Sequence, residues 1–329
     1  MDSVHRSIMS EPMPRDARIY VAGHRGMAGS AIVRRLEERG YTNIVTRTRA
    51  ELDLANQSAV HDFVRAARPA YIFVAAAKVG GIAANNKFRA DFIYQNLVIE
   101  TNLIHAAFDA GVAGLLFLGS SCIYPRDCPQ PMKEEYLLTG PLEQTNEPYA
   151  IAKIAGVKLC ESFNRQYGTR FVSAMPTNLY GPNDNYDLEN SHVLPALLRK
   201  AHEAKLRGDA TMEVWGSGRP RREFLHVEDM ADAVILMMER RLTDGLYNVG
   251  SGTDVTIEEL ARTIVDIVGF RGELRFDPSR PDGTMQKLLD IGRIRALGWQ
   301  PRFDLRSGIA DAYRAFLESS WSAASRATG

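Results

Sequence analysis

The sequence has few cysteines, no excess of either charge and no long apolar run. Its three cysteines, Cys122, Cys128 and Cys160, form no CxxC pair. Structural zinc and a secreted disulfide scaffold are therefore not expected, no metal site is predicted, and a reducing, cytoplasmic setting is indicated. Forty basic residues balance forty acidic ones, so we expect no nucleic-acid or membrane partner. No stretch approaches the roughly 20 apolar residues of a membrane helix.

The 329 residues, 45% of them hydrophobic, suffice for two domains or one α/β unit with a smaller lobe. Residues 1–17 contain no apolar core segment, so we expect a disordered leader and not a signal peptide. Strand and helix patterns alternate over residues 18–175, which predicts a doubly wound parallel sheet, the Rossmann fold. Residues 176–329 predict mainly a smaller α/β substrate-binding lobe, with segments near 223–250 returning to the first domain.

A glycine-rich turn follows the first predicted strand. The apolar run at 19–22 leads into Gly23-His24-Arg25-Gly26-Met27-Ala28-Gly29, and a helical pattern covers 30–39. Glycines at such a turn let the backbone approach a pyrophosphate at a helix N-terminus. The pattern predicts a dinucleotide site between a strand and a helix.

Two arginines, Arg47 and Arg49, follow the second predicted strand at 43–46. An acidic residue at this place holds the ribose 2′-hydroxyl of NAD, whereas arginine suits the 2′-phosphate of NADP. The nearest acid, Glu51, comes later, and Asp53 is expected near the adenine. NADP is therefore predicted over NAD, although two solvated surface arginines would give the same pattern.

Tyr149 and Lys153 are four residues apart in a predicted helix that begins near Pro148, so they project from one face. A cation one turn away should lower the pKa of the phenol, which makes Tyr149 a usable proton donor and acceptor. A chance exposed pair has the same spacing. The prediction depends on the segment from Ser120 to Pro125, which follows the predicted strand at 115–118 and ends at the same sheet edge.

These motifs together resemble the extended short-chain dehydrogenase/reductase family over positions 18–318. Further similarity, in His24–Met27, Ala75–Gly81, Ser120–Pro125 and Asn190–Val193, is to the GDP-L-fucose synthases within it. The resemblance implies NADPH-dependent 3,5-epimerisation and 4-reduction of GDP-4-keto-6-deoxy-D-mannose by a homodimer. The helices expected at 92–110 and 149–167 would form the interface between the two copies.

The resemblance also implies roles for individual residues. It assigns catalysis to Ser120, Cys122, Tyr149, Lys153 and His192. It assigns cofactor binding to Gly23, His24, Arg25, Gly26, Met27, Gly29, Arg47, Arg49, Asp53, Leu54, Ala76, Leu118, Gly119, Ser120, Tyr149, Lys153, Pro176, Asn178, Leu179 and His192. It assigns substrate binding to Lys200, Trp215, Arg222 and Asp282.

The proposed acid–base pair has chemical support. A thiol and an imidazole have ordinary pKa values of ~8.5 and ~6.5, near working pH. Without the resemblance, Cys122 would be read as a small core residue, and His192 and Arg222 as surface residues. Two other enzyme classes fit the scaffold, a nucleotide-sugar 4-epimerase and a 4,6-dehydratase. A non-catalytic NADP-binding module is a further alternative, which the presence of Ser120, Tyr149 and Lys153 disfavours.

Overall fold

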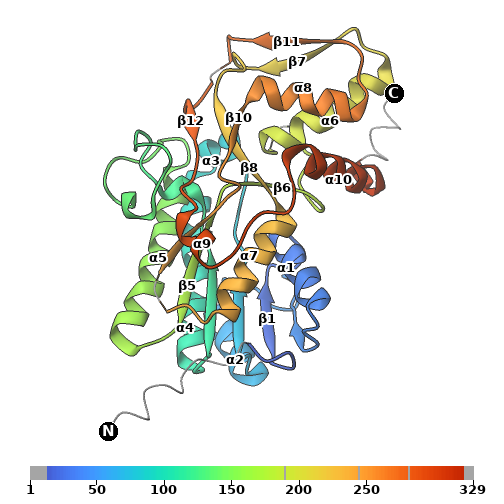
Figure 1. Ribbon diagram of the computed structural model, residues 1–329. Helices are drawn as coiled ribbons and strands as arrows, with labels where there is room; N and C mark the ends of the chain where they lie inside the picture. Colours follow the sequence, from blue (N-terminus) through green and yellow to red (C-terminus); the bar gives the residue numbers. More distant parts are fainter. Residues whose placement is uncertain (1–12, 189, 244, 281, 322–329) are drawn as a thin grey trace.

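The structure is a computed structural model that describes residues 13–188, 190–243, 245–280 and 282–321. Its largest element is a six-stranded parallel sheet with the order β2-β1-β3-β4-β5-β9 (Figure 1). The strands are β1 (Ile19–Ala22), β2 (Ile44–Val45), β3 (Tyr71–Val74), β4 (Gly114–Leu118), β5 (Phe171–Pro176) and β9 (Leu246–Val249). Every residue of β1, β3 and β4 is buried, as expected for parallel strands covered on both faces. The predicted doubly wound sheet is confirmed.

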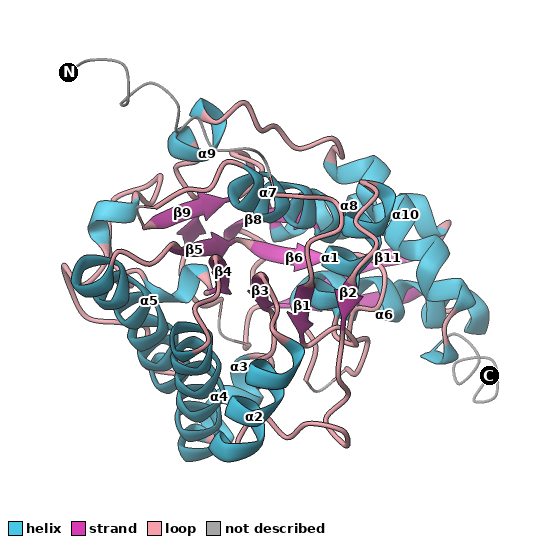
Figure 2. Cartoon of the chain, turned by 90° about the horizontal axis from the view of Figure 1, so that it is seen from below, coloured by secondary structure: helices cyan, strands magenta, loops and turns pink. Residues whose placement is uncertain are grey.

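Helices cover both faces of this sheet, which Figure 2 shows along the strands. One face carries α2 (Gln57–Ala67), α4 (Arg89–Asp109) and α5 (Glu147–Tyr167), and the other carries α1 (Met27–Glu38) and α7 (Val227–Glu239). The short helix α3 (Ile82–Lys87) leads into α4. Among the described helices, none has both the length and the apolar character that crossing a bilayer requires.

A smaller lobe lies beyond the carboxyl ends of the strands (Figure 1). Its strands are β6 (Asn178–Tyr180), β7 (Thr211–Trp215), β8 (Arg221–His226), β10 (Asp254–Thr256), β11 (Glu273–Asp277) and β12 (Gln286–Lys287). Its helices are α6 (Val193–Arg207), α8 (Ile257–Val268) and α10 (Leu305–Glu318), and α9 (Gly292–Ala296) lies nearer the large sheet. A second hydrophobic core joins α6, α8 and α10 through the fully buried Leu198, Leu260 and Phe316.

The chain passes between the large sheet and the smaller lobe several times. It leaves the large sheet at Thr177 to form β6, which pairs with β8. It returns at His226–Val227 to form α7 and β9, and β9 pairs with β5. The layer that carries the glycine turn is therefore completed by residues 227–249.

The expectation of a disordered leader over 1–17 is wrong for residues 13–17, while residues 1–12 lie outside the described part of the chain. Met13 is only 2% exposed and belongs to the main hydrophobic core. Its carbonyl oxygen lies 3.4 Å from the Tyr41 hydroxyl, which donates to it. A single apolar residue gives no periodic pattern, so its burial could not be predicted from the sequence.

Candidate active site

The glycine turn lies where the strand order of the large sheet reverses, between β1 and β3, which is the usual ligand crevice of such sheets. Gly23 has φ of +88°, and a Cβ there would lie 2.7 Å from the backbone nitrogen of Ala76. A Cβ on Gly29 would collide with the carbonyl oxygen of Gly23. Both positions therefore require glycine.

The start of α1 has the properties of an anion site. Its N-cap is Gly26, which offers no side-chain hydrogen bond, so the first-turn N–H groups remain available to a ligand. His24, in the same turn, has a buried Nδ1 atom without a hydrogen-bond partner. A pyrophosphate with its hydrogen-bonding oxygens fits this turn.

Positive charge gathers after β2. The Arg47 guanidinium lies 5.1 Å from the centroid of the Phe63 ring, and Arg49 is exposed. The Glu51 carboxylate accepts a 2.7 Å hydrogen bond from the Thr48 N–H, and this bond holds the pKa of Glu51 low, with help from Arg47 and Arg25. The first acid after the arginines thus faces its own backbone, and the arginines remain for an anionic ligand.

The next two predicted cofactor residues use their polar groups within the loop. The Asp53 carboxylate accepts a 3.1 Å hydrogen bond from the Ala55 N–H. The Leu54 carbonyl accepts a 2.9 Å bond from the side chain of Asn102. Both bonds fix the backbone that follows the arginines.

Tyr149 and Lys153 lie on α5 beside the end of β4. Lys153 is 2% exposed, and its ammonium group donates a 3.0 Å hydrogen bond to the carbonyl oxygen of Leu118. It lies 5.8 Å from the centroid of the Tyr149 ring. The predicted fall in the pKa of Tyr149 is wrong. Loss of water around the phenol raises that pKa, and Cys122 and Glu100 add to the rise.

A buried carboxylate, Glu100 of α4, lies behind this pair. It is 1% exposed, and its Oε2 atom is 3.9 Å from the Lys153 Nζ atom. Burial raises the pKa of Glu100 to about 7, although Lys153 and the Gly156 N–H oppose the rise. Burial also lowers the pKa of Lys153, and Glu100 opposes that fall. Each group therefore influences the charge of the other.

Ser120 and Cys122 follow β4 at the same edge of the sheet. Ser120 is the N-cap of a short 3-10 helix, η1 (Ser121–Ile123), and accepts a 3.5 Å hydrogen bond from the Cys122 N–H. Cys122 is 9% exposed. Burial raises the pKa of its thiol, while Ser120, Lys287 and Lys153 oppose the rise. The expected thiol pKa near working pH is therefore wrong for this state.

His192 precedes α6 as its N-cap. Its segment reaches the loop after β3, because the Gly81 N–H donates a 2.9 Å hydrogen bond to the Asn190 carbonyl. Neighbouring protein atoms take the place of part of the water around the imidazole, and this desolvation lowers the pKa of His192. The side chain is nevertheless exposed on one side.

A cleft of about 240 Å³ lies between the loop after β3, the start of α4 and the segment that precedes α6. It is lined by Lys78, Val79, Gly80, Ala84, Phe88, Asp91, Phe92, Asn185 and Asn190. The Phe92 ring also contacts Tyr149, with a centroid distance of 6.3 Å. The cleft thus joins the His192 segment to the tyrosine.

The four predicted substrate residues lie on the smaller lobe. The Lys200 ammonium is 4.6 Å from the centroid of the Trp215 ring, and Trp215 is 54% exposed. Asp282 accepts hydrogen bonds from the N–H and hydroxyl of Ser217, at 2.6 and 2.7 Å. Burial lowers the pKa of Arg222, and Asp282 opposes the fall. An exposed aromatic ring with cations beside it suits a base and a diphosphate.

The chain also matches a known family. The model of the family described as "NAD dependent epimerase/dehydratase family" covers residues 19–250. The chain belongs to the NAD dependent epimerase/dehydratase family.

The chain is also similar to several named proteins and solved structures. A GDP-L-fucose synthase of Escherichia coli strain K12 is 57% identical over 311 residues, which are 92% of this chain and 97% of that protein. A crystal structure of a GDP-L-fucose synthetase from Naegleria fowleri bound to NADP is 28% identical, with a TM-score of 0.87. That match covers 94% of this chain and 97% of the other. A GDP-6-OMe-4-keto-L-xylo-heptose reductase from C. jejuni is 41% identical, with a TM-score of 0.87 and coverage of 93% and 99%.

Three further predicted cofactor residues in this epimerase/dehydratase chain lie where β5 ends and β6 begins. Pro176 closes β5, and Asn178 and Leu179 belong to β6. The Asn178 side chain donates a 2.8 Å hydrogen bond to the carbonyl oxygen of Glu223, so its amide nitrogen also holds β6 to β8.

Two residues beside the site were not predicted from the sequence. Glu100 is far along the chain from Lys153, and only the packing of α4 on α5 brings them together. Lys287 of β12 pairs in register with Arg222 of β8. Its ammonium group has a lowered pKa, mainly through burial, and Cys122 opposes the fall. Neither residue lies in a motif that spacing alone could identify.

Proposed function

We propose that the chain is a GDP-L-fucose synthase, an NADPH-dependent enzyme that epimerises GDP-4-keto-6-deoxy-D-mannose at carbons 3 and 5 and reduces it at carbon 4. The observation that carries the proposal is the meeting of Ser120, Cys122, Tyr149 and Lys153 at one sheet edge. The 57% identity to the Escherichia coli GDP-L-fucose synthase supports the same reaction.

NADP(H) is the cofactor. The start of α1 and the glycine turn suit its pyrophosphate, and Arg47 and Arg49 suit its 2′-phosphate. Residues 18–175 together with 227–249 form the cofactor-binding part, and the smaller lobe binds the sugar nucleotide. When bound, the reduced nicotinamide supplies a hydride for carbon 4.

Tyr149 supplies the proton to the oxygen on carbon 4. The phenol is protonated at neutral pH, so it has a proton to give. Ser120 donates a second hydrogen bond to the same oxygen, and the two donors stabilise negative charge when a neighbouring carbon loses a proton. Lys153 holds the end of β4 through Leu118, and its positive charge stabilises the phenolate that Tyr149 becomes when it gives up its proton. A proton from solvent then restores the phenol.

Cys122 and His192 share the acid and base roles at carbons 3 and 5. Inversion at each carbon requires one group to remove a proton and another to return one on the opposite face. Lys287 and Lys153 favour the thiolate of Cys122 against burial. The lowered pKa of His192 keeps a neutral imidazole available as a base.

Deuterium incorporation tests the proposal. In deuterated water with GDP-4-keto-6-deoxy-D-mannose and NADPH, the enzyme should place deuterium at carbons 3 and 5 and form GDP-L-fucose. Cys122→Ser and His192→Asn should lose most of that exchange, because neither a hydroxyl nor an amide has a pKa near neutrality, so neither can remove or return the proton on carbon. Cys128→Ser, at a half-buried free cysteine, is the matched control and should keep it.

The same assay examines a second candidate, a GDP-sugar 4-ketoreductase without epimerase activity. The similarity to the C. jejuni GDP-heptose reductase favours it. It would consume NADPH and yield a reduced sugar without deuterium at either carbon. Undiminished exchange in a folded Cys122→Ser variant would return Cys122 to a core role.

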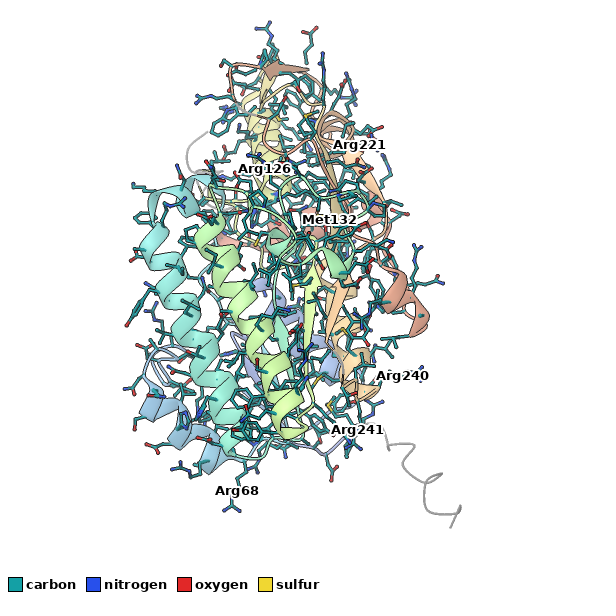
Figure 3. The ribbon with its side chains drawn as sticks, turned by 90° about the vertical axis from the view of Figure 1, so that its left-hand side faces the viewer. Arg68, Arg126, Met132, Arg221, Arg240 and Arg241 are labelled. Carbon is teal, nitrogen blue, oxygen red and sulfur yellow. The ribbon has the colours of Figure 1, made fainter. Side chains whose placement is uncertain are left out.

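The chain is further proposed to act in the cytoplasm as a homodimer. Helices α4 and α5 lie side by side on one side of the molecule (Figure 3). They expose the large apolar side chains of Tyr94, Ile151 and Tyr167, at 67%, 41% and 53%. Such a patch suits a second copy of the chain. Sedimentation should give twice the chain mass, and Tyr94→Lys with Ile151→Lys should give the single mass.

A further inference from the structure

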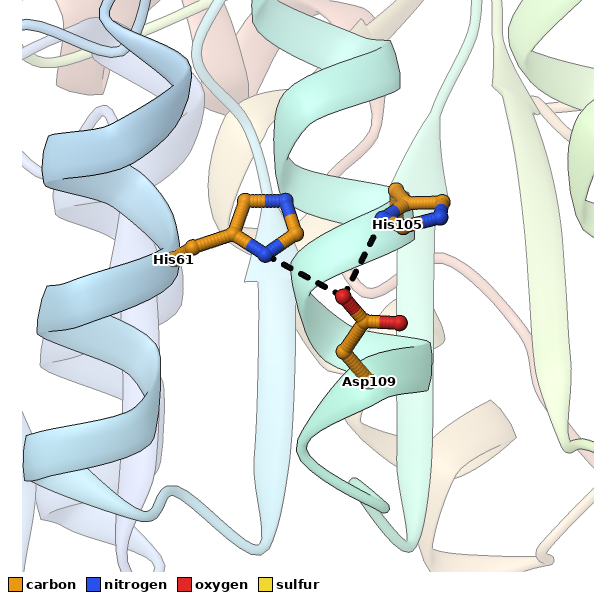
Figure 4. A group of neighbouring side chains, drawn as sticks. All are labelled: His61, His105 and Asp109. Atoms are coloured by element: carbon orange, nitrogen blue, oxygen red, sulfur yellow. Dashed lines mark ion pairs between the residues drawn. The ribbon is translucent and has the colours of Figure 1, made fainter.

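Two histidines and an aspartate from adjacent helices form one cluster (Figure 4). One of these helices, α2, lies at the end of the large sheet opposite the smaller lobe (Figure 1). His61 projects from α2, and His105 and Asp109 project from one face of α4, four residues apart. The side chains are 15%, 49% and 39% exposed, respectively. Solvent can therefore reach the cluster, while α2 and α4 hold it.

One oxygen of Asp109 is shared by both imidazoles. Its Oδ2 atom lies 3.2 Å from the Nδ1 atom of His61 and 3.4 Å from the Nδ1 atom of His105. A charge-assisted hydrogen bond between such groups is usually about 2.7–2.9 Å long. Both distances are longer, so neither imidazole makes a tight bond to the carboxylate.

The same distances fit metal coordination. Zinc binds imidazole nitrogen at about 2.0–2.1 Å and carboxylate oxygen at about 2.0–2.2 Å, which puts tetrahedral ligand atoms roughly 3.3–3.5 Å apart. All three candidate atoms lie within 4.8 Å of one another. Imidazole and carboxylate are ligands that zinc accepts.

We propose that His61, His105 and Asp109 bind one zinc ion or a similar divalent transition metal. Water or a group from a second copy is the fourth ligand. The ion joins α2 to α4 at the end of the molecule remote from the cleft. It therefore stabilises the helical layer and takes no part in sugar chemistry. The proposal does not depend on the function proposed above.

A zinc titration of the full-length chain tests this site. The protein is first stripped with a chelator, and zinc is then added in competition with a chromophoric chelator. We expect one tight site per chain, with affinity that falls at acidic pH because protons compete for the imidazoles. Cobalt in the same site should give the strong visible absorption of tetrahedral coordination.

Three variants locate the ion. His105→Gln and Asp109→Asn change partly exposed side chains and should each weaken zinc binding at least ~10-fold. They should also abolish the rise of a few degrees in Tm that zinc gives the parent protein. Asp62→Asn, at an exposed acid beside His61 that pairs only loosely with Arg65 at 3.7 Å, is the matched control and should keep both effects.

Other outcomes would overturn the site. If both variants retain the full affinity and the rise in Tm, zinc binds elsewhere, for example at the cysteines. If the stripped parent protein takes up no zinc and its Tm is unaffected, the three side chains form only a cluster of polar contacts without a metal. Circular dichroism of each variant distinguishes a lost ligand from a lost fold.

Discussion

Glu100 and Lys153 share a buried space behind Tyr149, and burial acts on them in opposite directions. It raises the pKa of the acid and lowers that of the base, so low polarity favours the neutral form of both. A Lys153 that carries charge therefore needs the charge of Glu100 beside it. The pair links the protonation of the site to the folding of α4 on α5.

Glu100→Gln should change how stability depends on pH. The folded pKa of about 7 lies above the ordinary 4.5, so the folded state retains the proton longer than the unfolded state. The contribution of Glu100 to the free energy of unfolding is fully present below about pH 4.5 and is lost as pH rises through 7. The loss is on the order of 1–3 kcal/mol. Glutamine does not titrate. The variant should therefore gain unfolding free energy relative to the parent between these pH values, measured in urea titrations. A constant difference across that range would contradict the assignment.

Tyr149→Phe should remove reduction while leaving the fold intact. The ring and its contact with Phe92 remain, and only the proton donor is lost. We expect kcat to fall at least ~10²-fold, the usual scale for a missing general acid. NADPH oxidation is measured together with Tm and cofactor affinity. Near-normal turnover with an unchanged Tm would exclude the tyrosine from the mechanism.

At the scale of elements, the turn between β1 and α1 distinguishes two kinds of glycine. A Cβ on Gly29 would collide with the carbonyl oxygen of Gly23, whereas a Cβ on Gly26 would lie 3.5 Å from that oxygen, which is an ordinary contact. Gly26 also has φ of −78°, which any residue adopts. Packing therefore requires glycine at position 29, whereas at position 26 the requirement comes from the ligand that the helix faces.

Gly29→Ala and Gly26→Ala should therefore differ in stability. The first should lose about 1–3 kcal/mol of unfolding free energy, the usual cost of overpacking, and should bind NADPH poorly. The second should keep the parent Tm within a degree or two but still bind NADPH more weakly, because a methyl group obstructs the pyrophosphate. Calorimetry and fluorescence titration give both values. Equal Tm losses would refute the distinction.

The loop after β2 should determine cofactor choice. Arg49→Ala removes a cation where the 2′-phosphate is proposed to lie, and a charge-assisted contact contributes on the order of 1.5–3 kcal/mol. We expect kcat/KM for NADPH to fall ~10- to 100-fold, with little change for NADH. Arg65→Ala, on the exposed side of α2, is the control. A parent enzyme with equal kcat/KM for the two cofactors would show that the arginines do not select.

The sequence predicted these elements because their patterns are local. The strand at 19–22 and the helix predicted at 30–39 follow from consecutive residues, as does the shared face of Tyr149 and Lys153, although the helix begins earlier than predicted, at Met27. The raised pKa of Tyr149 and the neighbour Glu100 could not be predicted, because burial depends on helices that meet only in the fold. Lys287 was missed for the same reason, since β12 reaches the site from near the C-terminus. The burial of Met13 likewise depends on tertiary contacts.

For the whole molecule, the large sheet depends on residues from the second half of the sequence. Strand β9 covers the edge of β5, and α7 covers the sheet face beside α1. Ion pairs join the two helices, including one between Arg35 and Asp232 at 2.8 Å and one between Arg39 and Glu239 at 2.7 Å. The Rossmann layer is therefore not an independent unit of the sequence.

A fragment that ends at residue 180 should fail to fold. It retains β1 to β5 but loses α7 and β9, so one face of the sheet and the edge of β5 become exposed. We expect dye binding typical of exposed apolar surface, no cooperative thermal transition and no NADPH binding. A fragment that melts in one sharp transition and binds NADPH would show that the first 180 residues form a domain.

The repeated passage of the chain between the two layers, at Thr177, at His226–Val227 and between β9 and β10, limits how they can move. A body attached at one point can turn about any axis through that point, but attachment at several separated points removes most of those rotations. Large swings of the smaller lobe are therefore disfavoured. We therefore expect any opening and closing of the cleft to come from the short segment between β3 and α3, whose residues Lys78, Val79 and Gly80 line it. Product escape through such segments takes microseconds to milliseconds in many enzymes, and it sets an upper bound on turnover that does not depend on the chemistry.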